Sequence, residues 1–211
     1  MLLKQINCNL IKIYKMIENC YLKMVRAFIS ISFEDEDILK GVQEIQDQIK
    51  NSGANVRLVN PEILHITLEF LGEISEEQVT ILSEMLSEIK FESLKLQVKG
   101  PGVLPNEKHV RVVYCEINGE VEKLKEIQKE IRNKLRNKGF KVDSRPFKPH
   151  LTIGRVKSPK NKDVLIKVIK NLSEYSCGVQ EINSIQLKKS ILKTEGPEYS
   201  VLYKVDALDK R

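Results

Sequence analysis

Two of the three histidines in this 211-residue chain are each followed, two positions later, by a threonine. The pairs are His65 with Thr67 and His150 with Thr152, and the whole chain contains four threonines. Counted against this composition, two such pairs arise by chance with a probability on the order of one in a thousand. An apolar residue separates the members of each pair and another follows it. The repetition therefore indicates that both pairs serve one chemical task.

Both pairs are expected to lie on β-strands, in which successive side chains point to opposite faces. His65 and Thr67 then share one face of their strand, and His150 and Thr152 share one face of theirs. The opposite, apolar faces are predicted to carry Ile66, Leu68 and Phe70 on the first strand and Leu151 and Ile153 on the second. Each strand thus buries one face and presents an imidazole beside a hydroxyl.

Two imidazoles that flank one substrate atom suit acid–base catalysis, because an unperturbed histidine has a pKa of about 6.5. One ring can then accept a proton while the other donates one, and each transfer contributes about 10²–10⁴-fold. Threonine hydroxyls together with a nearby cation suit phosphoryl oxygens, so phosphorus is the expected reaction centre. Neither pair has the H-x-x-x-H or carboxylate-cluster spacing of a metal site, and no metal or other cofactor is expected.

The stretches around these residues resemble the two-histidine (2H) phosphoesterases, in the branch of RNA 2′,3′-cyclic phosphodiesterases historically called 2′-5′ RNA ligases. The matching stretches are V-R-A-F-I at 25–29, H-I-T-L-E-F-L-G at 65–72 and R-P-F-K-P-H-L-T-I-G-R-V at 145–156, with weaker matches at 100–105 and 187–199. The resemblance covers the chain from Met24 onward and leaves residues 1–23 outside.

The resemblance implies metal-free hydrolysis of a terminal RNA 2′,3′-cyclic phosphate to a 2′-phosphomonoester, with RNA ends that carry this phosphate as partners. It makes His65 the proton donor to the leaving 3′ oxygen and His150 the proton acceptor that activates water. It places Thr67 and Thr152 on the non-bridging oxygens. Two alternatives stay open: 2′-5′ ligation of RNA as the main activity, and a non-catalytic protein that binds RNA ends.

Three further residues each have a functional and a structural interpretation. The resemblance makes Arg155 a phosphate contact, yet strict alternation puts it opposite the second histidine unless a bulge at Gly154 re-aims it. Otherwise Arg155 is a solvated charge at a strand end. Phe147 either stacks on a base or anchors its loop on the core. His109 follows the polar stretch 106–108 and is expected in an exposed loop, with a contact to RNA as the functional alternative.

Strands and helices alternate irregularly along the chain, and this favours an α+β fold with antiparallel sheets over a parallel one. Strands are expected from 25 to 32, within 56–71, and at 94–98, 110–117, 149–156, 182–192 and 199–205. Helices are expected from the acidic run 34–37 to 51, from 75 to about 89, and at about 121–137 and 164–172. Residues 100–105 are expected to form a loop. The resemblance adds a bilobal arrangement, with two sheets lining a central cleft and helices outside.

Composition sets wider limits on the protein. The chain has 35 Lys and Arg against 29 Asp and Glu, a net charge of +6 that permits an anionic partner without specifying one. The four cysteines match no metal or redox spacing, which favours reduced thiols and a cytoplasmic location. No apolar stretch is long enough for a membrane-spanning helix. We expect a monomer without membrane association.

Residues 1–23 need a separate interpretation, because apolar side chains recur there at helical spacing. One interpretation is a helix that binds a membrane surface or a partner. The other is a natural start at Met24, with residues 1–23 either a loosely attached extension or the result of a mis-assigned start codon. We predict that residues 24–211 form a single bilobal domain.

Overall fold

The computed structural model describes residues 24–194 and 196–209, and the predicted extension 1–23 lies outside them. In chain order its elements are β1 (Val25–Ser32), α2 (Glu36–Asn51), β2 (Val56–Leu58), the 3₁₀ turn η1 (Pro61–Ile63), β3 (His65–Ile74), α3 (Glu76–Ser87), β4 (Leu94–Asn106), β5 (His109–Gly119), α4 (Val121–Asn137), β6 (His150–Val156), α5 (Lys162–Asn171), β7 (Ser176–Ile182), β8 (Ser184–Leu192) and β9 (Pro197–Asp206).

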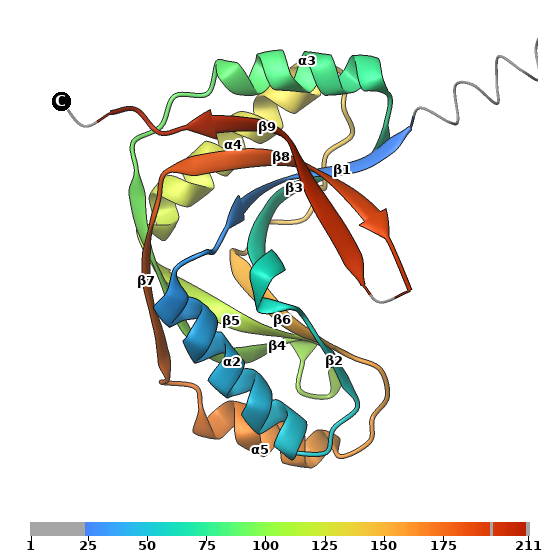
Figure 1. The fold of residues 1–211 in the computed structure, drawn as a ribbon, viewed down its shortest axis with the longest axis vertical. Coiled ribbons are helices and arrows are strands. Elements are labelled where there is room, and N and C mark those ends of the chain that lie inside the picture. The colour runs from blue at the N-terminus through green and yellow to red at the C-terminus, as the bar shows by residue number, and fades with distance from the viewer. Residues whose placement is uncertain (1–23, 195, 210–211) are drawn as a thin grey trace, which may run out of the picture.

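The strands form two antiparallel sheets, as the sequence predicted. The first sheet has the order β3-β1-β8-β9, and the second has the order β2-β6-β5-β4-β7. Figure 1 shows the first sheet in the upper half of the molecule and most of the second in the lower half. The two predicted histidine strands therefore belong to different sheets, β3 at one edge of the first and β6 inside the second.

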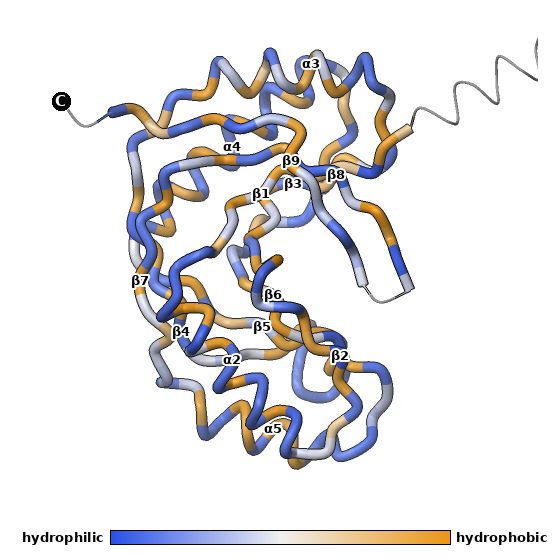
Figure 2. The backbone as a smooth tube through the Cα atoms, viewed as in Figure 1, coloured by the Kyte–Doolittle hydropathy of each residue, from blue (hydrophilic) through white to orange (hydrophobic). Residues whose placement is uncertain are grey.

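Helices cover the outer faces of both sheets. Helices α2 and α5 pack against the second sheet, while α3 contacts β9 and α4 contacts β3 (Figure 1). Local sequence explains where they begin: Asp35 accepts a hydrogen bond from the backbone N–H of Ile38, and Ser75 forms a capping box with Gln78. Hydrophobic and hydrophilic residues alternate along each helix in Figure 2, so each has one face for the core.

Buried apolar residues from both sheets and all four helices form one hydrophobic cluster. In β3 it takes Ile66 and Leu68, and in β6 it takes Leu151 and Ile153, all four at most 2% exposed. Burial of one face of each strand therefore fixes the direction in which the intervening histidine and threonine side chains point.

The structure corrects two expectations about the strands. Residues 100–105 belong to β4 and form no loop. The prolines are tolerated because Pro101 and Pro105 lie at register shifts, and because β4 pairs with β5 alone beyond Lys99. In addition, β7 precedes β8 as a separate strand where the sequence suggested only one. Within the described residues no helix is long and apolar enough to cross a membrane.

Candidate two-histidine active site

His65 is the first residue of β3 and is partly buried, as is Thr67 two positions on. Its ring nitrogen Nδ1 lies 2.8 Å from the backbone oxygen of Ile63. A carbonyl oxygen only accepts hydrogen bonds, so Nδ1 carries the proton. In the neutral ring Nε2 then keeps its lone pair and is available to a substrate.

His150 repeats this arrangement at the start of β6. It is partly buried together with Thr152, and its Nδ1 lies 2.7 Å from the backbone oxygen of Lys148. In both half-sites the accepting carbonyl belongs to the residue two positions before the histidine. Both imidazoles thus have the same tautomer and present Nε2, although they come from different sheets.

The two half-sites lie close together. Strands β3 and β6 contact each other, and the charges of Lys188, Arg155 and His150 all act on the ring of His65. Burial, together with these charges, lowers the pKa of His65 from its ordinary value of 6.5 to about 4, although the hydrogen bond to Ile63 opposes the shift. His65 is therefore neutral at pH 7 in the free protein.

A β-bulge follows the first threonine. In the ladder between β1 and β3, Ser30 pairs with Thr67 and Ile29 pairs with Glu69, so Leu68 is an extra residue. Leu68 and Glu69 are consequently both buried, which interrupts the alternation of faces.

A second bulge follows the second threonine at the same position. In the ladder between β5 and β6, Tyr114 pairs with Thr152 and Val113 pairs with Gly154, which leaves Ile153 extra. Ile153 and Gly154 are both buried in turn. The two H-x-T strands thus share the tautomer of their histidine and also the irregularity that follows their threonine.

The bulges decide where the fifth residue after each histidine points. Arg155 pairs with Val112, which lies two residues from Tyr114 on β5, so Arg155 returns to the face of Thr152. Its charge acts on both His65 and Tyr199. The predicted bulge thus exists, and the extra residue is Ile153, one position before Gly154.

Phe70 is the counterpart of Arg155 in the first half-site, and the prediction that it lies on the apolar face is wrong. It pairs with Phe28, two residues before Ser30 on β1, and so shares the face of Thr67. Its side chain is 60% exposed, and its ring centroid lies 6.4 Å from that of Phe28.

Three aromatic rings that the sequence analysis did not single out surround the histidines. The ring centroids of Phe28 and Tyr199 lie 5.0 and 5.2 Å from that of His65, and Tyr114 lies 5.7 Å from His150. These contacts help to bury His65 and restrict the orientation of both imidazoles. They depend on strand pairing across long sequence separations, for which a single sequence holds no local signal.

A buried carboxylate connects the two half-sites. Glu69 on β3 is 3% exposed and accepts a 2.9 Å hydrogen bond from Nε of Arg132 on α4. It also accepts a 3.0 Å bond from the backbone N–H of Asp143, and Arg132 donates to the backbone oxygen of Arg145. These bonds attach the segment before His150 to Glu69, which lies four residues after His65 on β3.

The other two candidates are placed outside this contact network. His109 begins β5, is exposed, and pairs with Asn106 at the end of the β4–β5 hairpin, so it does not lie in a loop as expected. Phe147 is partly buried and packs against the hydrophobic core, which supports its interpretation as a loop anchor.

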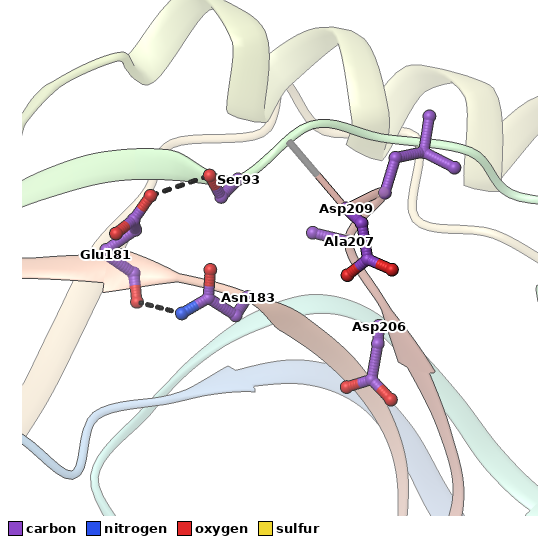
Figure 3. Close-up of a pocket in the computed structure, with 7 residues that line it drawn as sticks. Ser93, Glu181, Asn183, Asp206, Ala207 and Asp209 are labelled. Atoms are coloured by element: carbon purple, nitrogen blue, oxygen red, sulfur yellow. Dashed lines mark hydrogen bonds between the residues drawn. The ribbon is translucent and has the colours of Figure 1, made fainter. Parts of the chain in front are cut away.

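Figure 3 shows a separate hollow lined by Ser93, Glu181, Asn183, Asp206, Ala207, Leu208 and Asp209. All of its charged side chains are acidic, so it disfavours a phosphate. Among the residues that the structure describes, no three His, Cys, Asp or Glu side chains are grouped so that they could hold a metal ion.

Comparison with known proteins agrees with this geometry. The model of a family described as the AKAP7 2'5' RNA ligase-like domain matches residues 27–206. Two proteins named RNA 2',3'-cyclic phosphodiesterase are similar: that of Methanocaldococcus jannaschii is 39% identical over 179 residues (84% of this chain, 98% of the relative), and that of Aeropyrum pernix is 35% identical over 163 residues (77% and 93%).

Solved structures share the fold. The crystal structure of TT0787 from Thermus thermophilus superposes with a TM-score of 0.69 at 26% identity, covering 86% of this chain and 97% of that one. Apo LigT from E. coli gives a TM-score of 0.71 at 22% identity, with 89% and 99% covered. The family match over most of the chain confirms the resemblance drawn from the motifs, and the chain belongs to the AKAP7 2'5' RNA ligase-like domain family of 2H phosphoesterases.

Proposed function

We propose that the chain is an RNA 2′,3′-cyclic phosphodiesterase, which opens a terminal cyclic phosphate to a 2′-phosphomonoester. The observation that supports this most directly is the matched pair of imidazoles, each held through Nδ1 by a backbone carbonyl and each presenting Nε2. The curated relatives that carry this activity in their names match 77% and 84% of the chain.

In the proposed reaction Nε2 of His150 accepts a proton from water, whose oxygen attacks phosphorus. The bond between phosphorus and the 3′ oxygen breaks, and His65 donates a proton to that oxygen. The hydroxyls of Thr67 and Thr152 donate hydrogen bonds to the non-bridging oxygens, and Arg155 neutralises their charge. In the part of the chain that the structure describes, neither threonine hydroxyl has an intramolecular hydrogen bond, so both are available for this role.

His65 needs a proton before it can donate one, and the negative charge of the bound substrate favours its protonation. In the free protein, burial and the charges of Lys188, Arg155 and His150 keep the pKa of His65 at about 4. A phosphate anion beside the ring opposes these positive charges and raises the pKa of His65. The substrate therefore promotes the protonation on which its own cleavage depends.

The test is incubation of the purified protein, in EDTA, with an oligoribonucleotide that ends in a 2′,3′-cyclic phosphate. The expected product is a 2′-phosphate end, and His65→Ala and His150→Ala are each expected to lower turnover by at least about 10²-fold. Full activity in either variant would contradict the proposed site. Tight binding without turnover by the unaltered protein would instead favour a protein that only binds RNA ends.

A second candidate function is 2′-5′ ligation, which the description of the matched family favours. The same two histidines would act in exchanged roles, since ligation is the reverse of cleavage with an RNA 5′-hydroxyl in place of water. Adding a second RNA fragment with a 5′-hydroxyl to the same incubation separates the two reactions. Ligation as the main activity requires joined product to exceed hydrolysed ends.

We also propose that the protein acts as a monomer on RNA ends in the cytoplasm. Both histidines come from one chain, so the site needs no second copy. The free thiols of Cys115 and Cys177 are consistent with a reducing compartment. Light scattering after size-exclusion chromatography tests the oligomeric state.

A further inference from the structure

Lys188 on β8 is a buried cation that the sequence motifs do not include. The residue is 8% exposed, and its Nζ donates a 2.6 Å hydrogen bond to the hydroxyl of Ser32. Within residues 24–194 and 196–209, no carboxylate forms an ion pair with this ammonium. The buried ammonium of Lys188 is therefore held by the neutral hydroxyl of Ser32, whereas a buried charge ordinarily has a counter-ion.

Strand pairing places this ammonium beside the first histidine. Lys188 pairs with Phe28 across the β1–β8 ladder, and the ring of Phe28 lies 5.0 Å from that of His65. The hydroxyl that Lys188 binds belongs to Ser32, which pairs with His65 across the β1–β3 ladder. The side chain of Lys188 thus crosses β1 and ends next to the strand position of His65.

A second hydrogen bond fixes the hydroxyl that holds Lys188. Ser32 donates to Oε1 of Gln186 at 2.9 Å, so its oxygen is free to accept from the ammonium. The ammonium has three N–H donors, and the structure gives a partner for one of them. Gln186 and Lys188 lie two residues apart on β8, on the same face, so the three side chains form one network.

Burial of this charge is unfavourable in the free protein. An ionised group removed from water loses solvation free energy that only a close partner of opposite charge or strong hydrogen bonds can offset. In agreement, burial lowers the pKa of Lys188, although the carboxylate of Glu34 acts in the opposite direction from a greater distance. The unpaired ammonium of Lys188 therefore becomes favourable only when an anion binds beside it.

We propose that Lys188 is a further catalytic residue, whose ammonium binds a non-bridging oxygen of the cyclic phosphate from the side of the first sheet. Arg155 then reaches the same phosphate from the second sheet. The proposal deepens the proposed function and rests on it for the identity of the phosphate. In this role the ammonium of Lys188 stabilises the negative charge that grows on the non-bridging oxygens as water attacks phosphorus.

The central test compares Lys188→Met with Lys188→Arg. Methionine keeps an apolar stem of similar length without the charge, and arginine keeps the charge. We expect Lys188→Met to lower kcat/KM for the cyclic-phosphate oligonucleotide by about 10²-fold. We expect Lys188→Arg to restore at least a tenth of the unaltered value, and Lys188→Met to unfold at an equal or higher temperature, since an unpaired buried charge has been removed.

Lys189 provides the matched control. It is the next residue on β8, carries the same charge, and lies on the opposite face, paired with Ala27. Lys189→Gln should keep kcat/KM within about twofold, because a contact with the phosphate depends on position and not on net charge. An equal loss in both variants would overturn the proposal in favour of long-range attraction.

Two measurements separate this proposal from the activity on which it rests. Binding of inorganic phosphate should weaken about tenfold in Lys188→Met, whether or not the unaltered protein turns over RNA. In addition, the pKa of His65 followed by NMR should rise in Lys188→Met, because the charge of Lys188 is among its causes. Unchanged phosphate affinity, or a variant that retains kcat/KM within threefold, would overturn the role of Lys188. Unaltered protein that binds phosphate but leaves RNA intact would overturn the proposed function alone.

Discussion

At the scale of single residues, the site consists of two imidazoles with the same tautomer and different surroundings. Each Nδ1 faces a carbonyl two residues upstream, but His65 also lies near two cations and two aromatic rings. Burial and positive charge act in the same direction on a histidine, because both disfavour its protonated form. His65 therefore titrates well below its ordinary range, which has consequences for activity and for stability.

For activity, we predict an acidic limb near pH 4 in the pH profile of kcat/KM, since this parameter reports the free enzyme. As the pH rises through 4, the free enzyme loses the proton that His65 must donate, so the rising acidic limb ends there and not at 6.5. Initial rates at low substrate test this between about pH 3.5 and about pH 9, a range that brackets both the lowered pKa of His65 and the ordinary histidine pKa. A profile whose lowest limb lies at 6.5 would contradict it.

For stability, the same depressed pKa of His65 makes the free energy of unfolding depend on pH. The unfolded chain takes up the proton near 6.5 and the folded protein only near 4, so the stabilisation is present above pH 6.5 and is lost as the pH falls to 4. The loss is at most about 3 kcal/mol. Urea unfolding at several pH values should show a weaker dependence in His65→Asn. Parallel curves for both proteins would refute the assignment to His65.

The position of Arg155 leads to a further prediction. Arg155→Gln is expected to lower kcat/KM by about 10²-fold through loss of a charged phosphate contact. Arg111 on β5 supplies the control, because it precedes Val112, the partner of Arg155, and so lies on the opposite face of the sheet. Arg111→Gln should have a much smaller effect on the same oligonucleotide, and similar losses in both variants would indicate general attraction of RNA.

At the scale of elements, the sequence predicted most helices well and the strand irregularities poorly. Helix α4 at Val121–Asn137 and the capping box at Ser75 depend on local spacing and on neighbouring side chains, which a sequence displays directly. The bulges at Leu68 and Ile153 depend on which strand pairs with which. For this reason the placement of the two H-x-T pairs on strands was predictable, whereas the direction of Phe70, the aromatic contacts and the burial of Lys188 were not.

The connection between Glu69 and Arg132 also belongs to this scale, because it ties β3 to α4 and to the segment before His150. Glu69→Gln is expected to lower the free energy of unfolding by about 3 kcal/mol, since it leaves a largely buried guanidinium without its charge partner. Urea unfolding measures this, and kcat should fall as well because the segment before His150 loses its anchor.

The double variant Glu69→Gln, Arg132→Met supplies the control for this effect. It should recover part of the lost stability, because neither charge is then left unpaired. If the loss of stability in the double variant equals the sum of the losses in Glu69→Gln and Arg132→Met, the ion pair does not act as a unit.

At the scale of the whole molecule, the candidate site lies where the two sheets meet. β3 is an edge of one sheet and β6 is internal to the other, and their buried residues join one hydrophobic cluster. Correct placement of two imidazoles that are 85 positions apart in the chain thus depends on packing of the entire core. Sequence could predict that the two strands converge only through the resemblance to a known family.

A truncation tests which part of the chain this architecture needs. Every residue assigned a role here lies between Phe28 and Tyr199, and the family match spans residues 27–206. A protein that starts at Met24 should keep kcat/KM within about twofold and the same unfolding temperature. A marked loss of turnover would show that residues 1–23 take part in the reaction.

The two bulges have one more consequence. They turn the fifth residue after each histidine toward the face that carries the histidine and the threonine, and these two residues differ: one is the cation Arg155, the other the exposed ring of Phe70. At these two positions a bound ligand therefore meets a guanidinium beside the second histidine and an apolar ring beside the first. This difference makes the two otherwise similar half-sites inequivalent, so a bound nucleotide has one preferred orientation.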